Sequence, residues 1–146
     1  MIYNSILELV GNTPLVRLKK VEEKYGLDCE LYAKLEKQNP AGSVKDRIAL
    51  AMYQDYINKG VLTPDTVVIE PTSGNTGIAL SAFGNYFKNR VIIVMPKSMS
   101  EQRKALMRAY HAELVLVDGG MKEAVNEANR IHSEIKNSII AGQFYN

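Results

Sequence analysis

The sequence contains one cysteine, no tryptophan and no long apolar run among its 146 residues. A single cysteine excludes an internal disulfide and a metal site built from several thiolates, and Cys29 is expected to be a small buried side chain. No stretch is apolar over the length of a membrane-spanning helix, and the first residues lack the basic-then-apolar pattern of a secretory signal. The sequence therefore predicts a cytoplasmic globular protein with no membrane partner.

An excess of one charge sign is missing too. Lysine and arginine number 18 against 16 acidic residues, which gives a net charge of +2, and the basic residues are scattered. Nucleic-acid binding relies on a basic patch or stripe, so no nucleic-acid partner is expected. His111 and His132 have no cysteine or carboxylate at metal-ligand spacing, so no metal site is expected.

Apolar residues are plentiful, at 46%, and their pattern predicts one α/β domain with one core. Short β-branched runs occupy residues 66–70, 91–95, 113–117 and 138–141, and helical patterns fill residues 76–88, 100–110 and 121–136. Nearly continuous apolar strands need cover on both faces, and a parallel connection needs a long crossover. The expected fold is an open parallel sheet with helices on both faces.

An additional helix is expected to start at Ser43, because Ser43 can cap it and Asp46, three residues later, can complete the capping box from the first turn. Val44, Ile48, Met52 and Tyr56 fall on one face of this helix, and Gly60 can end it. The strand-like residues 14–17 and 30–35 have no βαβ spacing to the rest. We therefore expect residues 1–40 to belong to another sheet and residues 41–146 to form the α/β domain.

The loop at residues 71–77 is the first place to seek a ligand, because ligands of open parallel sheets collect at the carboxyl ends of strands. It reads Pro-Thr-Ser-Gly-Asn-Thr-Gly, with hydroxyls, an amide and two glycines before a helix whose positive end points at it. This arrangement suits an anion. The alternative is an ordinary polar loop with a capping threonine, and the loop matches neither common nucleotide-binding pattern.

Lys45 is the second candidate, because the first turn of a helix disfavours an ammonium group and a neutral amine can form a Schiff base. Arg47 acts in the same direction and Asp46 opposes it. The alternative is a solvated surface lysine, and position alone leaves both open. Gln143, just after the last strand, is by itself an ordinary polar residue.

Three segments taken together resemble the cysteine synthase (O-acetylserine sulfhydrylase) family of fold type II pyridoxal-phosphate enzymes. They are GNTPLVRL at residues 11–18, NPAGSVKDR at 39–47 and EPTSGNTGIA at 70–79. Residues 95–100 and 112–116 extend the resemblance over essentially the whole chain. The same segments also resemble cystathionine β-synthase.

The resemblance implies roles for particular residues. Lys45 matches the lysine that binds pyridoxal 5'-phosphate as a Schiff base, and Asn75 matches the asparagine that hydrogen-bonds the cofactor ring hydroxyl. The loop that binds the substrate carboxylate is matched by Thr72, Ser73, Asn75 and Thr76. Gln143, followed by an aromatic residue and then Tyr145 and Asn146, matches a glutamine that faces the same carboxylate.

The implied reaction is a β-replacement on O-acetylserine, in which Lys45 removes the α-proton, acetate leaves and sulfide adds to give cysteine. The implied partners are a second copy, as a homodimer, and serine acetyltransferase. Closure of the loop at residues 72–76 would keep water away from the reacting substrate.

The chain departs from the family in length and at two positions. It matches the N-terminal half, so the glycine-rich phosphate loop and the residue facing the pyridine nitrogen have no counterpart, and the strands at residues 1–40 would belong to an incomplete larger domain. His111 stands where glycine is usual, and Gly142 replaces a polar residue. Two alternatives therefore stay open: a cystathionine β-synthase, and a truncated or split half without catalysis that acts as an assembly module.

Overall fold

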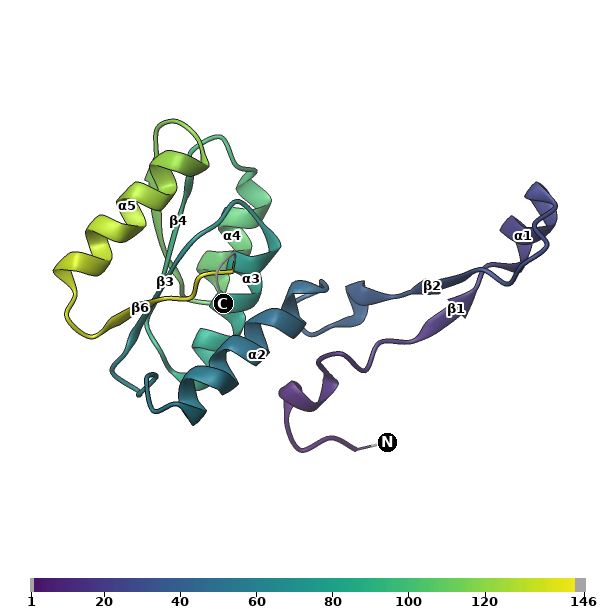
Figure 1. Ribbon diagram of the computed structural model, residues 1–146, viewed down its shortest axis with the longest axis horizontal. Coiled ribbons are helices and arrows are strands. Elements are labelled where there is room, and N and C mark those ends of the chain that lie inside the picture. The colour runs from purple at the N-terminus through teal and green to yellow at the C-terminus, as the bar shows by residue number, and fades with distance from the viewer. Residues whose placement is uncertain (1, 144–146) are drawn as a thin grey trace.

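A computed structural model describes residues 2–143, which form an α/β unit and a projecting N-terminal arm (Figure 1). The arm contains the 3₁₀ helix η1 (Ile6–Leu9), strand β1 (Leu15–Arg17), helix α1 (Lys19–Tyr25), strand β2 (Tyr32–Lys34) and the 3₁₀ helix η2 (Glu36–Gln38). The α/β unit contains α2 (Lys45–Asn58), β3 (Val67–Pro71), α3 (Asn75–Phe87), β4 (Val91–Pro96), α4 (Glu101–Ala109), β5 (Glu113–Val117), α5 (Met121–Glu134) and β6 (Ser138–Ile140).

The four strands of the α/β unit form one parallel sheet in the order β5-β4-β3-β6, as the sequence predicts. Ile69 of β3 lies in register with Ile92 of β4 on one side and with Ile140 of β6 on the other. Since β3 and β6 are neighbours, the chain returns from its far end to the strand with which the unit begins. The segments that follow β3 and β6 therefore leave the sheet side by side.

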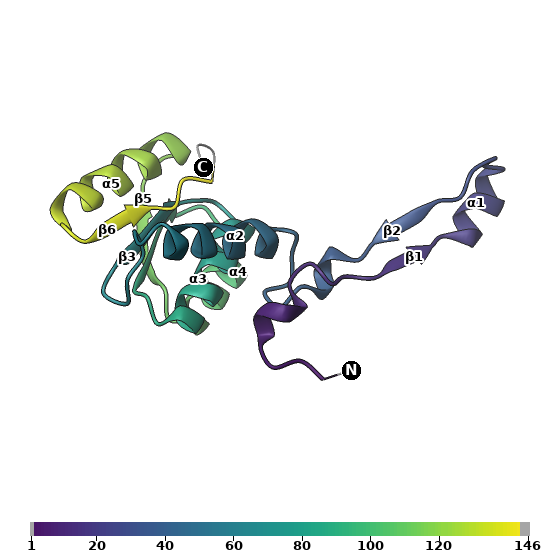
Figure 2. The same cartoon turned by 60° about the horizontal axis from the view of Figure 1, so that its bottom comes forward.

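Helices cover both faces of this sheet, which confirms the predicted fold class (Figure 2). Val67, Ile69 and Val94 pack with α5 on one face. Val68 and Ile93 point the other way and pack with residues of α2, α3 and α4. The alternation follows from the two-residue period of a strand.

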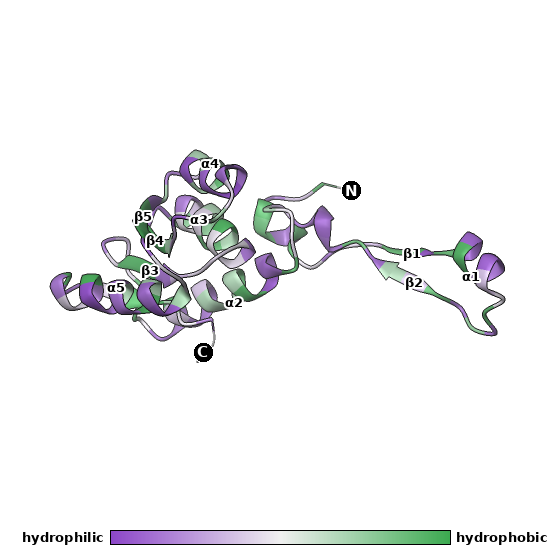
Figure 3. Cartoon of the chain, turned by 90° about the horizontal axis from the view of Figure 1, so that it is seen from above, coloured by the Kyte–Doolittle hydropathy of each residue, from purple (hydrophilic) through white to green (hydrophobic). Residues whose placement is uncertain are grey.

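In Figure 3, which is coloured by hydropathy, the helices of the α/β unit carry apolar and polar residues side by side. Among residues 2–143, no helix has the length and apolarity to cross a membrane.

Helix α2 begins where the sequence predicts a helix start, but its first turn is held differently. Ser43 Oγ accepts a hydrogen bond from the backbone N–H of Lys45 at 3.1 Å, as a capping hydroxyl does. Asp46 is buried, and its Oδ2 accepts a hydrogen bond from the backbone N–H of Ala41, ahead of the helix. This carboxylate therefore fixes the preceding loop to the helix. Gly60 follows the helix with φ +67, in agreement with its predicted role.

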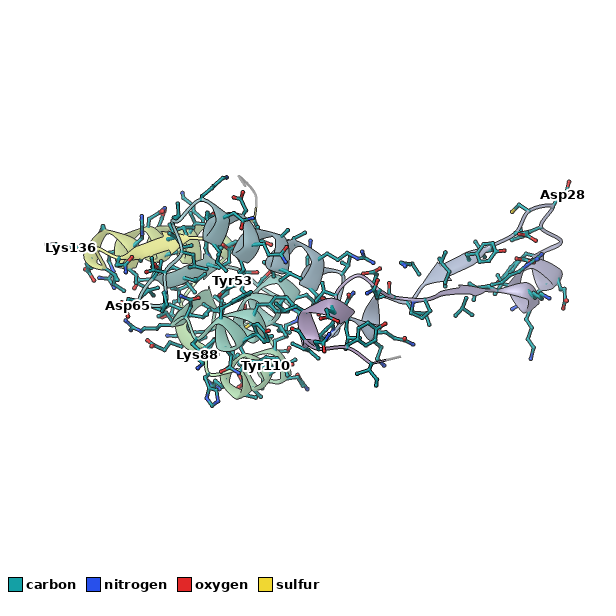
Figure 4. All side chains as sticks on the ribbon, turned by 90° about the horizontal axis from the view of Figure 1, so that it is seen from below. Asp28, Tyr53, Asp65, Lys88, Tyr110 and Lys136 are labelled. Carbon is teal, nitrogen blue, oxygen red and sulfur yellow. The ribbon has the colours of Figure 1, made fainter. Side chains whose placement is uncertain are left out.

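The buried face of α2 differs from the predicted face. Val44 is 47% exposed, whereas Ala49 and Tyr53 are buried together with Met52. The reason is the close packing of α2 on α3, because a Cβ on Gly84 of α3 would lie only 2.7 Å from the Tyr53 hydroxyl. Figure 4 shows Tyr53 inside the α/β unit. The small residues Ala49 and Gly84 allow α2 and α3 to pack closely. The positions of the large apolar residues in the sequence therefore did not predict which face of α2 is buried.

The N-terminal arm carries its own two-stranded antiparallel sheet. Leu15 pairs with Lys34 and Arg17 with Tyr32. Figures 1 and 2 show this hairpin extending away from the α/β unit, and Figure 4 places Asp28 at its tip. Cys29, next to Asp28, is exposed, so the prediction of a buried cysteine is wrong. The tip has no core in which a small side chain could be buried.

Candidate active site

The predicted ligand loop lies at the carboxyl edge of the sheet, between β3 and α3. Thr72 follows Pro71, the last residue of β3, and α3 begins at Asn75. The first N–H groups of α3 have no carbonyl partner within the helix, and they point toward this edge. The loop can therefore offer an anion both N–H groups and hydroxyls.

Gly77 is needed for the shape of this loop. A Cβ at Gly77 would lie 2.7 Å from Thr72 Cγ2 and 2.8 Å from Met107 Cε. Thr72 and Thr76 are both buried, at 3% and 2% exposed. The start of α3 is thus packed tightly between its own loop and α4, and the loop is preformed around two threonines.

Gln143 contacts this loop. Thr76 Oγ1 donates a hydrogen bond of 2.6 Å to Gln143 Oε1. The pairing of β6 with β3 explains the meeting, because the chain leaves β6 beside the start of α3. The NH₂ group of Gln143 donates no hydrogen bond to residues 2–143. Tyr145 and Asn146, which belong to the same motif, lie outside the described residues.

Ser73 and Asn75 have side chains that form no hydrogen bond with any of residues 2–143. Asn75 is exposed and Ser73 is half-buried. The carbonyl of Ser73 is held from α4, since Arg103 Nη1 donates a hydrogen bond of 3.2 Å to it. Arg103 also lies beside Gly74, where a Cβ would come within 3.7 Å of the guanidinium carbon. Sequence reasoning missed Arg103, because only the tertiary packing of α4 brings it to the loop.

Lys45 is the first residue of α2 and is half-buried. Its Nζ forms no hydrogen bond or ion pair within the part of the chain that the structure describes. The loop at residues 59–66 joins α2 to β3, so the helix runs antiparallel to the strand and starts toward the carboxyl edge. The structure thus places Lys45 toward the same edge as the Thr72–Thr76 loop, without a direct hydrogen bond between them.

A network of side chains fixes the start of α2 to the arm. Arg47 donates to both carboxylate oxygens of Glu36, from Nη2 at 2.8 Å and from Nε at 2.9 Å. This pairing lowers the pKa of Glu36 to about 2. Arg47 Nη2 also donates to the carbonyl of Gly11 at 3.0 Å. Because Arg47 follows Lys45 by two residues, the arm holds the helix turn that carries the amine. Burial raises the pKa of Asp46, which lies between them.

Glu70 is the second functional candidate that sequence reasoning missed. It lies in β3 just before the loop, and it is only 1% exposed. Its Oε2 accepts a hydrogen bond from the Gly142 N–H at 2.8 Å, and its Oε1 accepts one from the Gln143 N–H at 3.4 Å. Burial raises its pKa to about 7, while the two backbone hydrogen bonds act in the opposite direction. An acidic residue at the end of an otherwise apolar strand was the available signal.

The donor set at this edge fits pyridoxal phosphate in part. Lys45 offers an amine with no hydrogen-bond or ion-pair partner among residues 2–143, and Asn75 offers an exposed amide at the start of a helix. Thr72, Thr76 and Gln143 offer hydroxyl and amide groups for a carboxylate. No group of three or more histidine, cysteine, aspartate or glutamate side chains among residues 2–143 is arranged to hold a metal ion. Among the described residues, this edge of the sheet thus brings together an amine, an exposed amide and several hydroxyls.

Comparison with known proteins identifies pyridoxal phosphate as the cofactor of the family. A family described as pyridoxal-phosphate dependent enzyme matches residues 6–146. A cysteine synthase from Flavobacterium sp. is 48% identical over 148 residues, covering 100% of this chain and 47% of that protein. A cystathionine beta-synthase from Apis mellifera is 42% identical and covers 97% of this chain and 29% of that protein.

Solved structures extend the similarity to three dimensions. The crystal structure of a cysteine synthase from Entamoeba histolytica superimposes with a TM-score of 0.93 at 43% identity, covering 100% of this chain and 45% of that one. The chain therefore spans less than half the length of each of these relatives. Its fold is that of the corresponding part of the solved enzyme.

Proposed function

The chain belongs to the family of pyridoxal-phosphate dependent enzymes, and from that membership we propose that it supplies part of the active site of a cysteine synthase. The complete site would convert O-acetylserine and sulfide into cysteine and acetate. The observation that carries the proposal is the 2.6 Å hydrogen bond between Thr76 and Gln143. Two residues far apart in the sequence, each matched to the same carboxylate site, meet at the start of α3.

The cofactor would be held by Lys45 and Asn75. Lys45 Nζ would bind the aldehyde carbon of the cofactor, and the Asn75 amide would donate a hydrogen bond to the ring hydroxyl. Bound in this way, pyridoxal phosphate supplies the electron sink that stabilises negative charge on the α-carbon of an amino acid. Lys45 is half-buried and forms no ion pair within the described part of the chain, which supports this role, because no salt bridge there has to break before the amine reacts.

The carboxylate of the amino acid would lie against the loop at residues 72–76. The hydroxyls of Thr72 and Ser73 and the free N–H groups of α3 are its donors. Gln143 Oε1 already accepts from Thr76, so the Gln143 NH₂ group is oriented as one more donor. A substrate fixed at its carboxylate presents its α-carbon in one orientation, which is how positioning accelerates the reaction.

Lys45 would also move the α-proton. With an amino acid bound at the cofactor, the Lys45 Nζ atom would accept the proton from the α-carbon. Nζ would hold the proton while acetate leaves from the β-carbon and sulfide adds there, and would then return it to the α-carbon to give cysteine. The network of Arg47 and Glu36 would keep the amine within reach by fixing the first turn of α2.

Borohydride reduction tests the assignment of Lys45. The protein is incubated with pyridoxal phosphate, reduced and digested, and the label is located by mass spectrometry. We expect it on Lys45 and expect Lys45→Ala to lose both label and cysteine formation. Lys59→Ala is the matched control, because Lys59 lies at the other end of the same helix in a surface ion pair with Asp55. A label on another lysine in the wild-type protein would contradict the proposal.

Cystathionine β-synthase chemistry is the second candidate, and the 42% identical relative from Apis mellifera favours considering it. That reaction would use serine and homocysteine. Comparing sulfide with homocysteine as the acceptor separates the two, and a preference for homocysteine would replace the first proposal.

A role without catalysis is the alternative from another class, in which the chain acts as an assembly module. The expected partners in either case are a second copy and, by resemblance, serine acetyltransferase in the cytoplasm. Size-exclusion chromatography with light scattering tests the dimer, and a strictly monomeric folded protein would contradict it. Absence of any reduced label at Lys45 would favour the assembly module over the enzyme.

A further inference from the structure

Gln143 is held at two points, and only one of them belongs to the loop at residues 72–76. Its side chain accepts the hydrogen bond from Thr76, and its backbone N–H donates to Glu70. The Gly142 N–H donates to the other oxygen of the same carboxylate at 2.8 Å. Glu70 is thus the group that connects the start of the loop to the segment that carries Gln143.

The carboxylate of Glu70 accepts hydrogen bonds from the chain after β6, where the backbone pairing with β3 ends. The last backbone hydrogen bond between these segments joins the Ala141 N–H to the Ile69 carbonyl at 2.9 Å. Beyond it, Gly142 has φ +71 and the chain turns away from β3. The next two N–H groups are therefore bound by a side chain instead of a strand, which lets Gln143 bend toward Thr76.

A buried carboxylate is an expensive way to fill this position. Val68, a core residue on the same face of the strand, would be matched by an apolar side chain at position 70. Burial of a carboxylate there has a desolvation cost, because it disfavours the charged form of Glu70. Two oxygens that each accept one N–H group offer what an apolar side chain lacks. Glutamine offers one oxygen only, so one of the two N–H groups would then face an NH₂ group.

We propose that Glu70 is a positioning residue for substrate binding, which fixes Gly142 and Gln143 so that the Gln143 amide faces the substrate carboxylate. The proposal rests on the cysteine synthase function above. Glu70 itself does not touch the substrate and acts through Gln143. Its removal is therefore expected to weaken binding of the amino acid and to leave the chemical step nearly unchanged.

Steady-state kinetics of the cofactor-loaded protein at about pH 8 tests this separation. We expect Glu70→Gln to raise KM for O-acetylserine roughly tenfold, the range expected for a lost hydrogen bond to a charged group, with kcat changed less than about twofold. Glu113→Gln is the matched control, since this exposed carboxylate on β5 pairs with Arg90 away from the loop. An unchanged KM in Glu70→Gln would overturn the proposal.

A double-mutant cycle separates positioning from general stabilisation. Gln143→Ala should raise KM by itself, and Glu70→Gln should add little in that background, because its effect passes through Gln143. An equal rise in KM with and without Gln143 would overturn the proposal.

Measurements without cofactor distinguish failure of this proposal from failure of the proposed function. In the wild-type protein, NMR should show slow exchange of the Gly142 and Gln143 amide protons, and Glu70→Gln should shift the Gln143 side-chain amide signals. Fast exchange of both protons would overturn the positioning role even if cysteine forms. If no cysteine forms but exchange is slow and the signals shift, the enzyme assignment fails while the contact stands. Because exchange is measured on the wild-type protein, the test holds even if the variant does not fold.

Discussion

His111 adopts a left-handed backbone conformation that glycine occupies at much lower cost, and replacing it by glycine should stabilise the protein. Its φ is +64, directly after α4 and its cap Tyr110. The His111 N–H donates to the Arg108 carbonyl at 2.9 Å, and the Ala112 N–H donates to the Met107 carbonyl at 3.1 Å. This pair of bonds is the Schellman motif, in which glycine is the usual residue at the position of His111.

Two opposing effects set the magnitude of the change. The left-handed conformation costs a residue with a Cβ roughly 1–2 kcal/mol. Glycine also lowers the free energy of unfolding by about 0.4–1 kcal/mol, because it makes the unfolded chain more flexible. The exposed His111 side chain has little packing to lose. His111→Gly should therefore raise the free energy of unfolding by about 0.5–1 kcal/mol, or the melting temperature by roughly 2–3 °C in a domain of this size.

Urea denaturation followed by circular dichroism measures this difference. Lys88→Gly is a parallel variant, because Lys88 ends α3 with φ +63 and the same pair of backbone bonds. His111→Ala is the control, since alanine keeps the Cβ and should bring no gain. If His111→Gly is neutral or destabilising while Lys88→Gly stabilises, the argument from backbone strain at His111 is wrong.

Three further predictions concern the loop. Gly77→Ala should destabilise by about 1–3 kcal/mol in urea denaturation, because its Cβ would lie 2.7 Å from Thr72 Cγ2, and an undiminished midpoint would contradict this. Burial raises the pKa of Glu70 to about 7, so the folded protein holds the carboxyl proton of Glu70 more tightly than the unfolded chain does. As the pH rises from 4 to 8, the unfolding free energy of the wild-type protein should therefore fall by about 3 kcal/mol relative to that of Glu70→Gln, and parallel pH profiles of the two proteins would refute this. Arg103→Ala removes an exposed donor from the Ser73 carbonyl, so KM for the amino acid should rise a few-fold while the melting temperature changes little, and an unchanged KM would exclude a role in holding the loop.

The parallel sheet could be predicted because each strand carries its own signal. Residues 91–95 and 114–117 are apolar and contain several β-branched side chains, and each run is followed by a segment of helical period, so local patterns sufficed. The buried face of α2 could not be predicted in the same way. Ala49 is buried because Gly84 of another helix allows close approach, and that pairing has no local signature.

The candidate site shows the same division. Lys45 and the threonines of the loop follow from helix starts and strand ends, which are local features. Glu70 and Arg103 act on segments far from them in sequence, 72 residues away for Glu70 and Gly142 and 30 for Arg103 and Ser73. A sequence read alone shows a charged residue at a strand end or on a helix, but the fold decides which donor or acceptor it meets.

The pairing of β6 with β3 ties the carboxylate site to the stability of one sheet edge. β6 has only three registered pairs with β3, and a hydrogen bond of 3.0 Å from the Tyr56 hydroxyl to the Ala141 carbonyl adds to them. Short edge strands open locally at lower free energy than the centre of a sheet. If β6 opens before the centre of the sheet, Gly142 and Gln143 should separate from Glu70 while β3 and β4 remain paired. The loop would then keep its threonines but lose its glutamine, so weaker substrate binding should precede unfolding as denaturant is added.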